Sequence, residues 1–307
     1  MTVPVLRRVA LAAGLALLAG ACGGQGSASS ASTATPTAKP AAATTAAQAP
    51  ASCPPAGLRE VEGGLLRMPA GARPEETPLL LVVIPGGDGD PSDRLGVGAA
   101  ANRAGFAVLY PTSERGGFWQ LSDAQGTSDV AAVTGLIDRQ LQTGCFDDDR
   151  VSITGVSNGA GFSARMACEL PGRFAAVVPV AAGYRALDPC PASARGSFLA
   201  IHGTADTVVP FNGKRPDRKG NVPRNTARWA RRDGCSAPPR TSTPRRLVTR
   251  FTYRGCDAGT RVELLRLSGT EHGWPGAAPP RRPRNPSGLE AAPEVVRFIR
   301  DARRPAA

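Results

Sequence analysis

The sequence contains a serine whose neighbours are typical of an activated nucleophile. Ser157 stands at the centre of Gly155-Val156-Ser157-Asn158-Gly159, which matches the pattern G-x-S-x-G. In this pattern the serine occupies a tight turn between a strand and a helix, and the glycines two residues before and after it avoid a collision. A β-branched run precedes the motif and a helical pattern follows it. We therefore predict a nucleophile rather than the alternative, an ordinary serine in a glycine-rich loop.

A carboxylate and an imidazole follow Ser157 in the chain order serine, acid, histidine that accompanies this pattern at a strand-to-helix turn. Asp206 comes shortly after an apolar run at 198–201, and His272 after another at 262–267. An imidazole takes the proton of a serine hydroxyl at neutral pH, and a carboxylate orients the ring and stabilises its charged form. We predict Asp206 as the acid, the alternative being a structural turn residue, and His272 as the base. The only other histidine, His202, lies at a strand end, which suits a packing role.

The developing negative charge on a substrate oxygen needs two hydrogen-bond donors. We predict the backbone N–H of Asn158 as one donor and that of Gly87 as the other, because Gly87 lies in the loop after an apolar strand. The alternative for Gly87 is a simple Gly-Gly turn. Trp274 and Trp119 are candidates for lining a substrate pocket, although large aromatic residues also serve as core packing. This chemistry requires no cofactor, and no cysteine has metal-ligand spacing, so we predict no metal site.

Apolar runs bounded by turn residues alternate with helical patterns over the rest of the domain. The expected strands are 79–84, 106–110, 151–154, 174–181, 198–201 and 262–267, and the expected helices are 91–104, 128–143, 157–170, 225–232 and 293–302. This alternation is typical of an α/β fold with a doubly wound, mostly parallel sheet and helices on both faces. Ligands of such sheets bind at the carboxyl ends of the strands, where Ser157, Asp206 and His272 are expected.

The N-terminal 52 residues read as targeting and tether sequence. Residues 1–21 have two arginines followed by a short apolar run, which is typical of an export signal. Leu18-Ala19-Gly20-Ala21-Cys22 fits a bacterial lipobox with Cys22 as the lipid-attachment site. The alternative is an ordinary secretory signal with a chance cysteine. Residues 22–52 include an Ala/Ser/Thr/Pro linker that we predict to be disordered, and residues 53–307 form the predicted catalytic domain.

Both interpretations of the N-terminus place the domain outside the cytoplasm, in the extracellular space or the cell envelope. Seven cysteines less Cys22 leave six, which in an oxidising compartment form three disulfides with 15 possible connectivities. The net charge of +12 is nearly all arginine. This charge has two interpretations. One is attraction to anionic polymers or lipid headgroups, and the other is a compositional bias of the genome. No basic stripe interleaves with aromatic residues, so we predict no nucleic-acid partner and contact with a membrane only through the lipid.

Several motifs in the same order resemble one known family. The run from Thr154 to Gly159, the segment 176–183, His202 to Pro210 and His272 to Gly276 are similar to the polyhydroxybutyrate depolymerase and feruloyl-esterase-like α/β-hydrolases. The resemblance covers about residues 79–299 and implies a secreted carboxylic-ester hydrolase of the α/β-hydrolase fold. The family usually has a histidine before the oxyanion glycines, where this chain has Pro85.

The resemblance also bears on the disulfides and the reaction. It implies the pair Cys235–Cys256 and, by the same analogy, the pairs Cys53–Cys145 and Cys168–Cys190. The expected activity is a serine esterase that acts through an acyl-enzyme on polyhydroxybutyrate-type or short-chain hydroxyacyl esters. Alternatives are a feruloyl or acetyl esterase on plant polysaccharide, a serine peptidase of the same fold, or a cell-surface binding protein on a hydrolase scaffold. The sequence does not predict the oligomeric state.

Overall fold

The computed structural model describes residues 53–83, 94–113, 117–183, 190–213, 220–279 and 282–305. All of them belong to one compact unit that spans residues 47–307. The predicted signal, lipid-attachment site and linker, together with Gly87 and Pro85, lie outside the described residues.

A ten-stranded sheet forms the centre of this unit, in the order β1-β2-β4-β3-β5-β6-β7-β10-β9-β8. The strands are β1 (Gly57–Val61), β2 (Gly64–Met68), β3 (Thr77–Val83), β4 (Ala107–Pro111), β5 (Phe146–Val156), β6 (Ala176–Val180), β7 (Ser197–Gly203), β8 (Ala237–Arg245), β9 (Val248–Arg254) and β10 (Val262–Leu267). The six central strands, β4, β3, β5, β6, β7 and β10, pair in parallel. An antiparallel pair extends the sheet at each edge.

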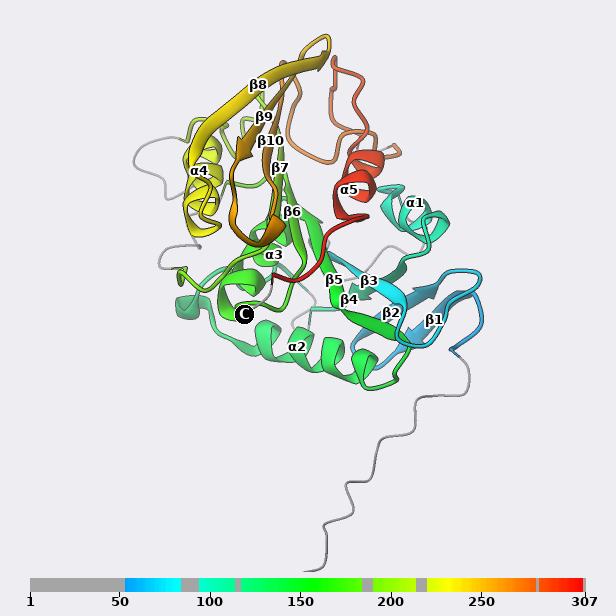
Figure 1. The fold of residues 1–307 in the computed structure, drawn as a ribbon. Coiled ribbons are helices and arrows are strands. Elements are labelled where there is room, and N and C mark those ends of the chain that lie inside the picture. The colour runs from blue at the N-terminus through cyan, green and yellow to red at the C-terminus, as the bar shows by residue number, and fades with distance from the viewer. Residues whose placement is uncertain are drawn as a thin grey trace, which may run out of the picture. The chain divides into compact units, whose positions relative to one another are not determined.

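Helices cover both faces of the sheet (Figure 1). They are α1 (Val97–Arg103), α2 (Ser128–Leu141), α3 (Asn158–Glu169), α4 (Val222–Arg232) and α5 (Ala291–Ile299), with short 3₁₀ turns η1 (Asp123–Gln125) and η3 (Asp257–Gly259). One core cluster joins the sheet to α2, α3 and α4, and a second joins it to α1 and α5. The α/β-hydrolase expectation of a mostly parallel sheet between helices is therefore confirmed.

Successive residues of the central strands supply these two cores alternately. Leu79 and Leu81 of β3 lie in the α2–α4 core, whereas Leu80 lies in the α1–α5 core. In the same way Val177 and Val178 of β6 point to opposite faces. Strand side chains alternate in direction, and a strand covered on both faces is therefore apolar at nearly every position. This explains why continuous apolar runs in the sequence located the central strands correctly.

The antiparallel edge strands were not predicted. β8 reads Ala-Pro-Pro-Arg-Thr-Ser-Thr-Pro-Arg and is almost wholly exposed. Proline lacks the N–H that an interior strand must donate, so a strand of this composition is viable only at an edge. The expected strand 151–154 is also longer than predicted, because Phe146 pairs with Thr77 and β5 begins there.

The observed helices begin and end within a few residues of the predicted positions. The helix predicted at 225–232 begins at Val222, because the Asn221 side chain accepts a hydrogen bond from the Arg224 N–H at 2.9 Å and Pro223 occupies the first turn. The last helix spans 291–299 rather than 293–302. The helix predicted at 91–104 begins at Val97 and ends at Arg103.

Three disulfides link segments that lie apart in the sequence. They are Cys53–Cys145, Cys168–Cys190 and Cys235–Cys256, so all three predicted pairs are confirmed. Cys53–Cys145 closes the longest loop, with 92 residues of separation, and ties the start of the described chain to the segment before β5.

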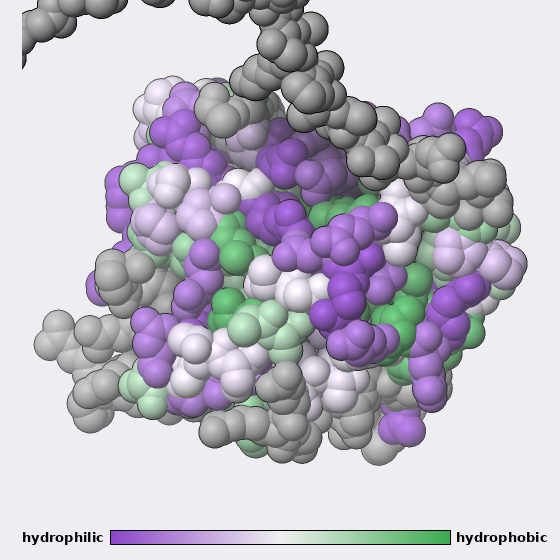
Figure 2. Space-filling model, turned by 90° about the horizontal axis from the view of Figure 1, so that it is seen from below, coloured by the Kyte–Doolittle hydropathy of each residue, from purple (hydrophilic) through white to green (hydrophobic). Residues whose placement is uncertain are grey.

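On the face drawn in Figure 2, hydrophilic residues predominate and the hydrophobic ones form small, separate patches. Within the described ranges no helix has the length and apolarity needed to cross a membrane.

Candidate active site

Ser157 occupies a strained turn between β5 and α3. Its backbone has φ 53° and ψ −120°, and the first residue of α3 follows immediately. A non-glycine residue with positive φ costs about 1–3 kcal/mol and persists only where its surroundings hold it. Two hydrogen bonds hold this one: the Ser157 N–H donates to the Val180 carbonyl at 3.0 Å, and the Gly161 N–H donates to the Ser157 carbonyl at 3.1 Å. The sharp turn leaves the Ser157 side chain partly exposed at the carboxyl end of β5.

The structure brings His272 and Asp206 to Ser157 from two other segments. His272 Nε2 lies 2.8 Å from Ser157 Oγ, and His272 Nδ1 lies 2.8 Å from Asp206 Oδ2. A carboxylate can only accept, so the proton of the neutral ring resides on Nδ1 and leaves Nε2 to accept from the hydroxyl. The His272 side chain is 21% exposed and the Asp206 side chain is wholly buried. These contacts form an uninterrupted path from a buried charge to a partly exposed hydroxyl.

Four donors surround the Asp206 carboxylate. Its Oδ1 accepts the Val208 and Val209 N–H groups at 3.0 and 2.7 Å, and its Oδ2 lies 3.2 Å from His202 Nε2 in addition to the bond from His272. Burial by itself raises the pKa of this carboxyl, but the hydrogen bonds from His202, His272 and Val209 outweigh it and hold the pKa well below its usual range. Asp206 is therefore ionised at any pH where an imidazole is neutral.

His202 contacts the carboxylate and not the serine. It is 1% exposed, and its Nε2 lies 2.8 Å from the Val209 carbonyl as well as beside Asp206. Both neighbours of Nε2 are acceptors, so Nε2 carries the proton and acts as a donor. Sequence reasoning gave His202 a packing role and missed this contact. The available signal was the spacing of four residues between His202 and Asp206 directly after a strand.

Asn158 serves the site with both its backbone and its side chain. Its N–H is in the first turn of α3, where donors have no acceptor within the helix and the helix dipole favours negative charge. The side-chain Oδ1 accepts the Trp119 N–H at 2.8 Å, and Nδ2 donates to the Trp119 carbonyl at 3.1 Å. This paired contact fixes the segment before α2 beside the nucleophile. Gly87, the other predicted oxyanion donor, lies outside the described residues.

Both tryptophans predicted as possible substrate contacts are 1% exposed. The Trp119 ring stacks on Phe162 of α3 with centroids 4.7 Å apart. Trp274 lies in the α1–α5 core. Burial of this extent favours the packing alternative for both residues, since neither offers surface to a substrate in this structure.

A buried arginine supports the segment that carries Trp119. Arg165 of α3 is 2% exposed and donates to the carbonyls of Gln120 and Gly126 at 3.1 and 2.9 Å. It also pairs with Asp123 at 2.7 Å and Glu169 at 2.8 Å. These contacts use four of the five guanidinium donors, so α3 holds the segment rigidly. No pattern in the sequence predicted this network.

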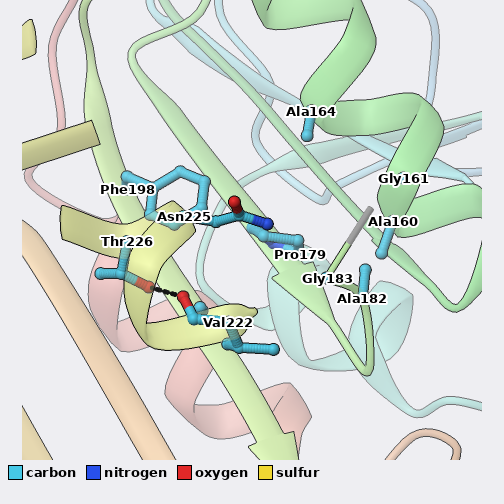
Figure 3. Close-up of a pocket in the computed structure, with 11 residues that line it drawn as sticks. Ala160, Gly161, Ala164, Pro179, Ala182, Gly183, Phe198, Val222, Asn225 and Thr226 are labelled. Atoms are coloured by element: carbon cyan, nitrogen blue, oxygen red, sulfur yellow. Dashed lines mark hydrogen bonds between the residues drawn. The ribbon is translucent and has the colours of Figure 1, made fainter. Parts of the chain in front are cut away.

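A small cavity lies beside the first turns of α3 (Figure 3). Its volume is about 20 Å³, which is room for roughly one water molecule. Ala160 and Gly161 of α3, Ala182 after β6, and Val222 and Asn225 of α4 form much of its wall. None of Ser157, Asp206 and His272 lines it, and we do not assign a substrate to it.

The part of the chain that the structure describes has no group of three His, Cys, Asp or Glu side chains placed to hold a metal ion.

We compared the chain with known protein families and with individual known proteins. The family model described as "Esterase PHB depolymerase" matches residues 64–185, a span that contains Ser157. Feruloyl esterase B from Piromyces equi is 28% identical over 155 residues, which are 47% of this chain and 28% of that protein. In sequence the chain is similar to polyhydroxybutyrate-depolymerase-type and feruloyl esterases. A bifunctional acetylxylan esterase/xylanase from Neocallimastix patriciarum is 28% identical over 178 residues, 56% of this chain and 25% of that protein.

The chain spans only about a quarter of the length of these two curated proteins. Among solved structures, the acetyl xylan esterase from Aspergillus awamori superposes with a TM-score of 0.55 at 19% identity, covering 70% of this chain and 94% of that one. The superposition supports the α/β-hydrolase fold. The family-model match ends before Asp206 and His272, so their position beside Ser157 rests on the geometry of this structure.

Proposed function

We propose that this protein is a serine carboxylic-ester hydrolase in which Ser157 is the nucleophile, His272 the general base and Asp206 the residue that orients it. The observation that carries the proposal is the chain of two 2.8 Å hydrogen bonds from Ser157 Oγ through His272 to Asp206. The strained Ser157 backbone supports it, because strain of this kind clusters at functional sites. The relationship to esterases supports the choice of an ester as substrate.

The reaction would proceed through an acyl-enzyme. Ser157 Oγ attacks the ester carbonyl carbon while its proton passes to His272 Nε2, and the carbonyl oxygen becomes an oxyanion. The N–H of Asn158 would donate to that oxyanion, and Gly87 is the proposed second donor. Collapse of the tetrahedral intermediate breaks the ester C–O bond, and His272 returns the proton to the leaving alcohol. Water then repeats the sequence on the acyl-enzyme, with His272 again as the base, and releases the carboxylic acid.

The substrate class we favour is a polyhydroxybutyrate-type or other short-chain hydroxyacyl ester. A feruloyl or acetyl ester on plant polysaccharide is a second candidate, favoured by the names of the relatives from Piromyces equi and Neocallimastix patriciarum. We also propose that the enzyme acts outside the cytoplasm, anchored to a bacterial membrane through a lipid on Cys22. Three disulfides support an oxidising compartment.

Hydrolysis of p-nitrophenyl butyrate by the full chain, beside Ser157→Ala, tests the reaction class. We expect turnover by the native protein and a loss to near background in the variant, because the nucleophile is removed while the fold remains. A fluorophosphonate probe should label the native protein and not the variant. If neither protein turns over the ester and neither labels, a binding protein on the same scaffold becomes the better account.

Two further comparisons separate the remaining alternatives. A peptide amide assayed beside the matching ester distinguishes a peptidase from an esterase. Oligomers of 3-hydroxybutyrate assayed beside methyl ferulate and an acetylated xylan rank the ester classes, and preference for either of the last two would replace our first choice.

A further inference from the structure

The positive charge of this protein is concentrated in one stretch of the chain. Residues 220–266 contain 11 arginines and three acidic residues, whereas residues 53–219 contain 16 basic and 18 acidic residues. A compositional bias of the genome would raise the arginine content throughout the domain. The contrast between these stretches therefore calls for a local explanation.

The fold gathers this stretch at one end of the sheet. Residues 220–266 comprise α4, β8 and β9 and most of β10, which lie together in Figure 1. Six of the arginines are exposed, and we call them the arginine surface: Arg224, Arg231, Arg240, Arg245, Arg246 and Arg254. Those on β8 also protect an edge strand from pairing with other chains, but α4 is not at an edge, so edge protection does not account for the whole set.

Strand register places part of the arginine surface at the catalytic edge of the sheet. The turn between β8 and β9 carries Arg246, and Val248 directly after it pairs with Leu267, the last residue of β10. The loop that follows Leu267 leads to His272. Arg224 lies in the first turn of α4, between Val222 and Asn225, which share a cavity wall with Ala160 of α3.

The acids of the same stretch do not neutralise this surface. Asp233 is buried and accepts the Gly196 N–H at 2.9 Å. Glu263 pairs with Arg250 at 2.5 Å, and Asp257 pairs with Arg195 at 3.4 Å. None of these partners belongs to the arginine surface, so its charge remains available to attract an anionic ligand.

The chemistry of the surface favours a polymer of carboxylates. All its cations are guanidinium groups, whose planar fork matches a carboxylate or a phosphate with two parallel hydrogen bonds. No aromatic residue of 220–266 is exposed for nucleic-acid bases to stack on, which favours the carboxylate. A surface that inserts into a membrane carries large apolar side chains beside its cations. The exposed large hydrophobic residues of the described chain are Leu58, Phe118 and Val208, and all lie outside residues 220–266.

We propose that the arginine surface binds a carboxylate-bearing polysaccharide and holds it beside Ser157. This inference rests on the proposed function with its second substrate class, an ester carried on a polysaccharide, because the bound polymer would carry the ester groups that the enzyme hydrolyses. The cations bind the acidic sugars of the chain, and esters on neighbouring sugars then reach the nucleophile at high local concentration.

Binding of polygalacturonate, a polysaccharide of carboxylated sugars, tests the proposal. The protein is the full chain carrying Ser157→Ala, to exclude hydrolysis, and Cys22→Ala, to exclude a lipid. We expect binding at low salt that weakens as salt is added, and no binding to neutral dextran. A triple variant, Arg224→Gln, Arg240→Gln and Arg246→Gln, should weaken binding about tenfold, since the loss of each exposed ion pair weakens binding about twofold.

A charge-matched control replaces three exposed arginines elsewhere, Arg73→Gln, Arg103→Gln and Arg300→Gln. Less than about twofold weakening in this control supports a specific surface. Equal weakening in both triple variants would mean that net charge alone attracts the polymer, and the proposal would be wrong. Absence of binding, or binding only to phosphatidylserine vesicles or DNA, would also overturn it.

Assays of ester hydrolysis distinguish a failure of this proposal from a failure of the proposed function. With Ser157 intact, the Arg224, Arg240 and Arg246 triple variant should hydrolyse p-nitrophenyl butyrate at the native rate, because that small ester does not need the surface. A native protein that binds polygalacturonate but hydrolyses no ester would overturn the esterase function and leave the binding surface intact.

Discussion

His202 is the residue whose replacement best tests how the catalytic carboxylate is held. Its Nε2–H is shared between the Val209 carbonyl at 2.8 Å and Asp206 Oδ2 at 3.2 Å, so it helps to fix both the carboxylate and the loop that carries it. We expect His202→Leu to remove this donor and His202→Gln to keep an N–H in nearly the same position. Both replacements leave Ser157 and His272 in place.

The size of the effect follows from the geometry. A hydrogen bond to a charged group contributes about 1.5–3 kcal/mol. The longer distance and the shared proton favour the lower end of that range, so we expect His202→Leu to lower kcat/KM about tenfold. Three donors would remain on Asp206, and the loss should therefore be far smaller than the roughly 10⁴-fold typical of removing a triad carboxylate.

The assay is kcat and KM on p-nitrophenyl butyrate together with the melting temperature of each variant. We expect the loss in kcat with little change in KM, and recovery of most of it in His202→Gln. Ile201→Val is the matched control, because Ile201 is fully buried on the same strand and its replacement loosens packing without removing a donor. A folded His202→Leu variant with native kcat would refute the reasoning. Equal losses in the Leu and Gln variants would show that His202 contributes only packing.

Three further changes probe the strain, the buried charge and the cross-links. The free energy of unfolding of Ser157→Gly should exceed that of Ser157→Ala by about 1 kcal/mol, because glycine tolerates the positive φ at this turn. Equal urea midpoints for the two variants would mean that the turn is unstrained. Burial raises the pKa of Asp233 to about 6, so its contribution to stability is fully present below the unfolded pKa and is lost as pH rises through about 6. Asp233→Asn should therefore stabilise the protein at pH 8 by up to about 3 kcal/mol and by much less at pH 4, and thermal melts that show the same gain at both values would contradict this. Replacing both Cys53 and Cys145 by serine opens a loop of 92 residues and should lower the unfolding free energy by about 4–5 kcal/mol in the chain-entropy account, whereas a loss below about 1 kcal/mol in denaturant titrations would contradict that account.

The central strands were predictable because burial on both faces leaves a continuous apolar signature. Leu79 to Leu81 are all fully buried although they belong to two different cores. The edge strands carry no such signature. β8 is held by its ladder with β9, which requires no apolar side chains, and its three prolines and polar residues pointed to a loop.

The ends of helices and strands were predicted less well than the elements themselves. β5 extends back to Phe146 because a neighbouring strand is available to pair with it there. The start of α4 was missed by three residues, although Asn221 and Pro223 together are a recognisable helix start. The first of these errors needed the tertiary structure, and the second did not.

The sequence by itself led to the proposed reaction class and to the three residues proposed to carry it. The sequence has one serine in a G-x-S-x-G pattern and only two histidines, so few sets of three catalytic residues are available. The chain order serine, acid, histidine then selects Ser157, Asp206 and His272. Only the tertiary structure decided what surrounds them: His202 as a donor to Asp206, Asn158 locked to Trp119, and Arg165 beneath the same segment. These contacts join residues on different elements, and their distances and burial depend on how the whole sheet and its helices pack. A sequence names the groups that can react, but the directions in which their hydrogen bonds point exist only once the chain has folded.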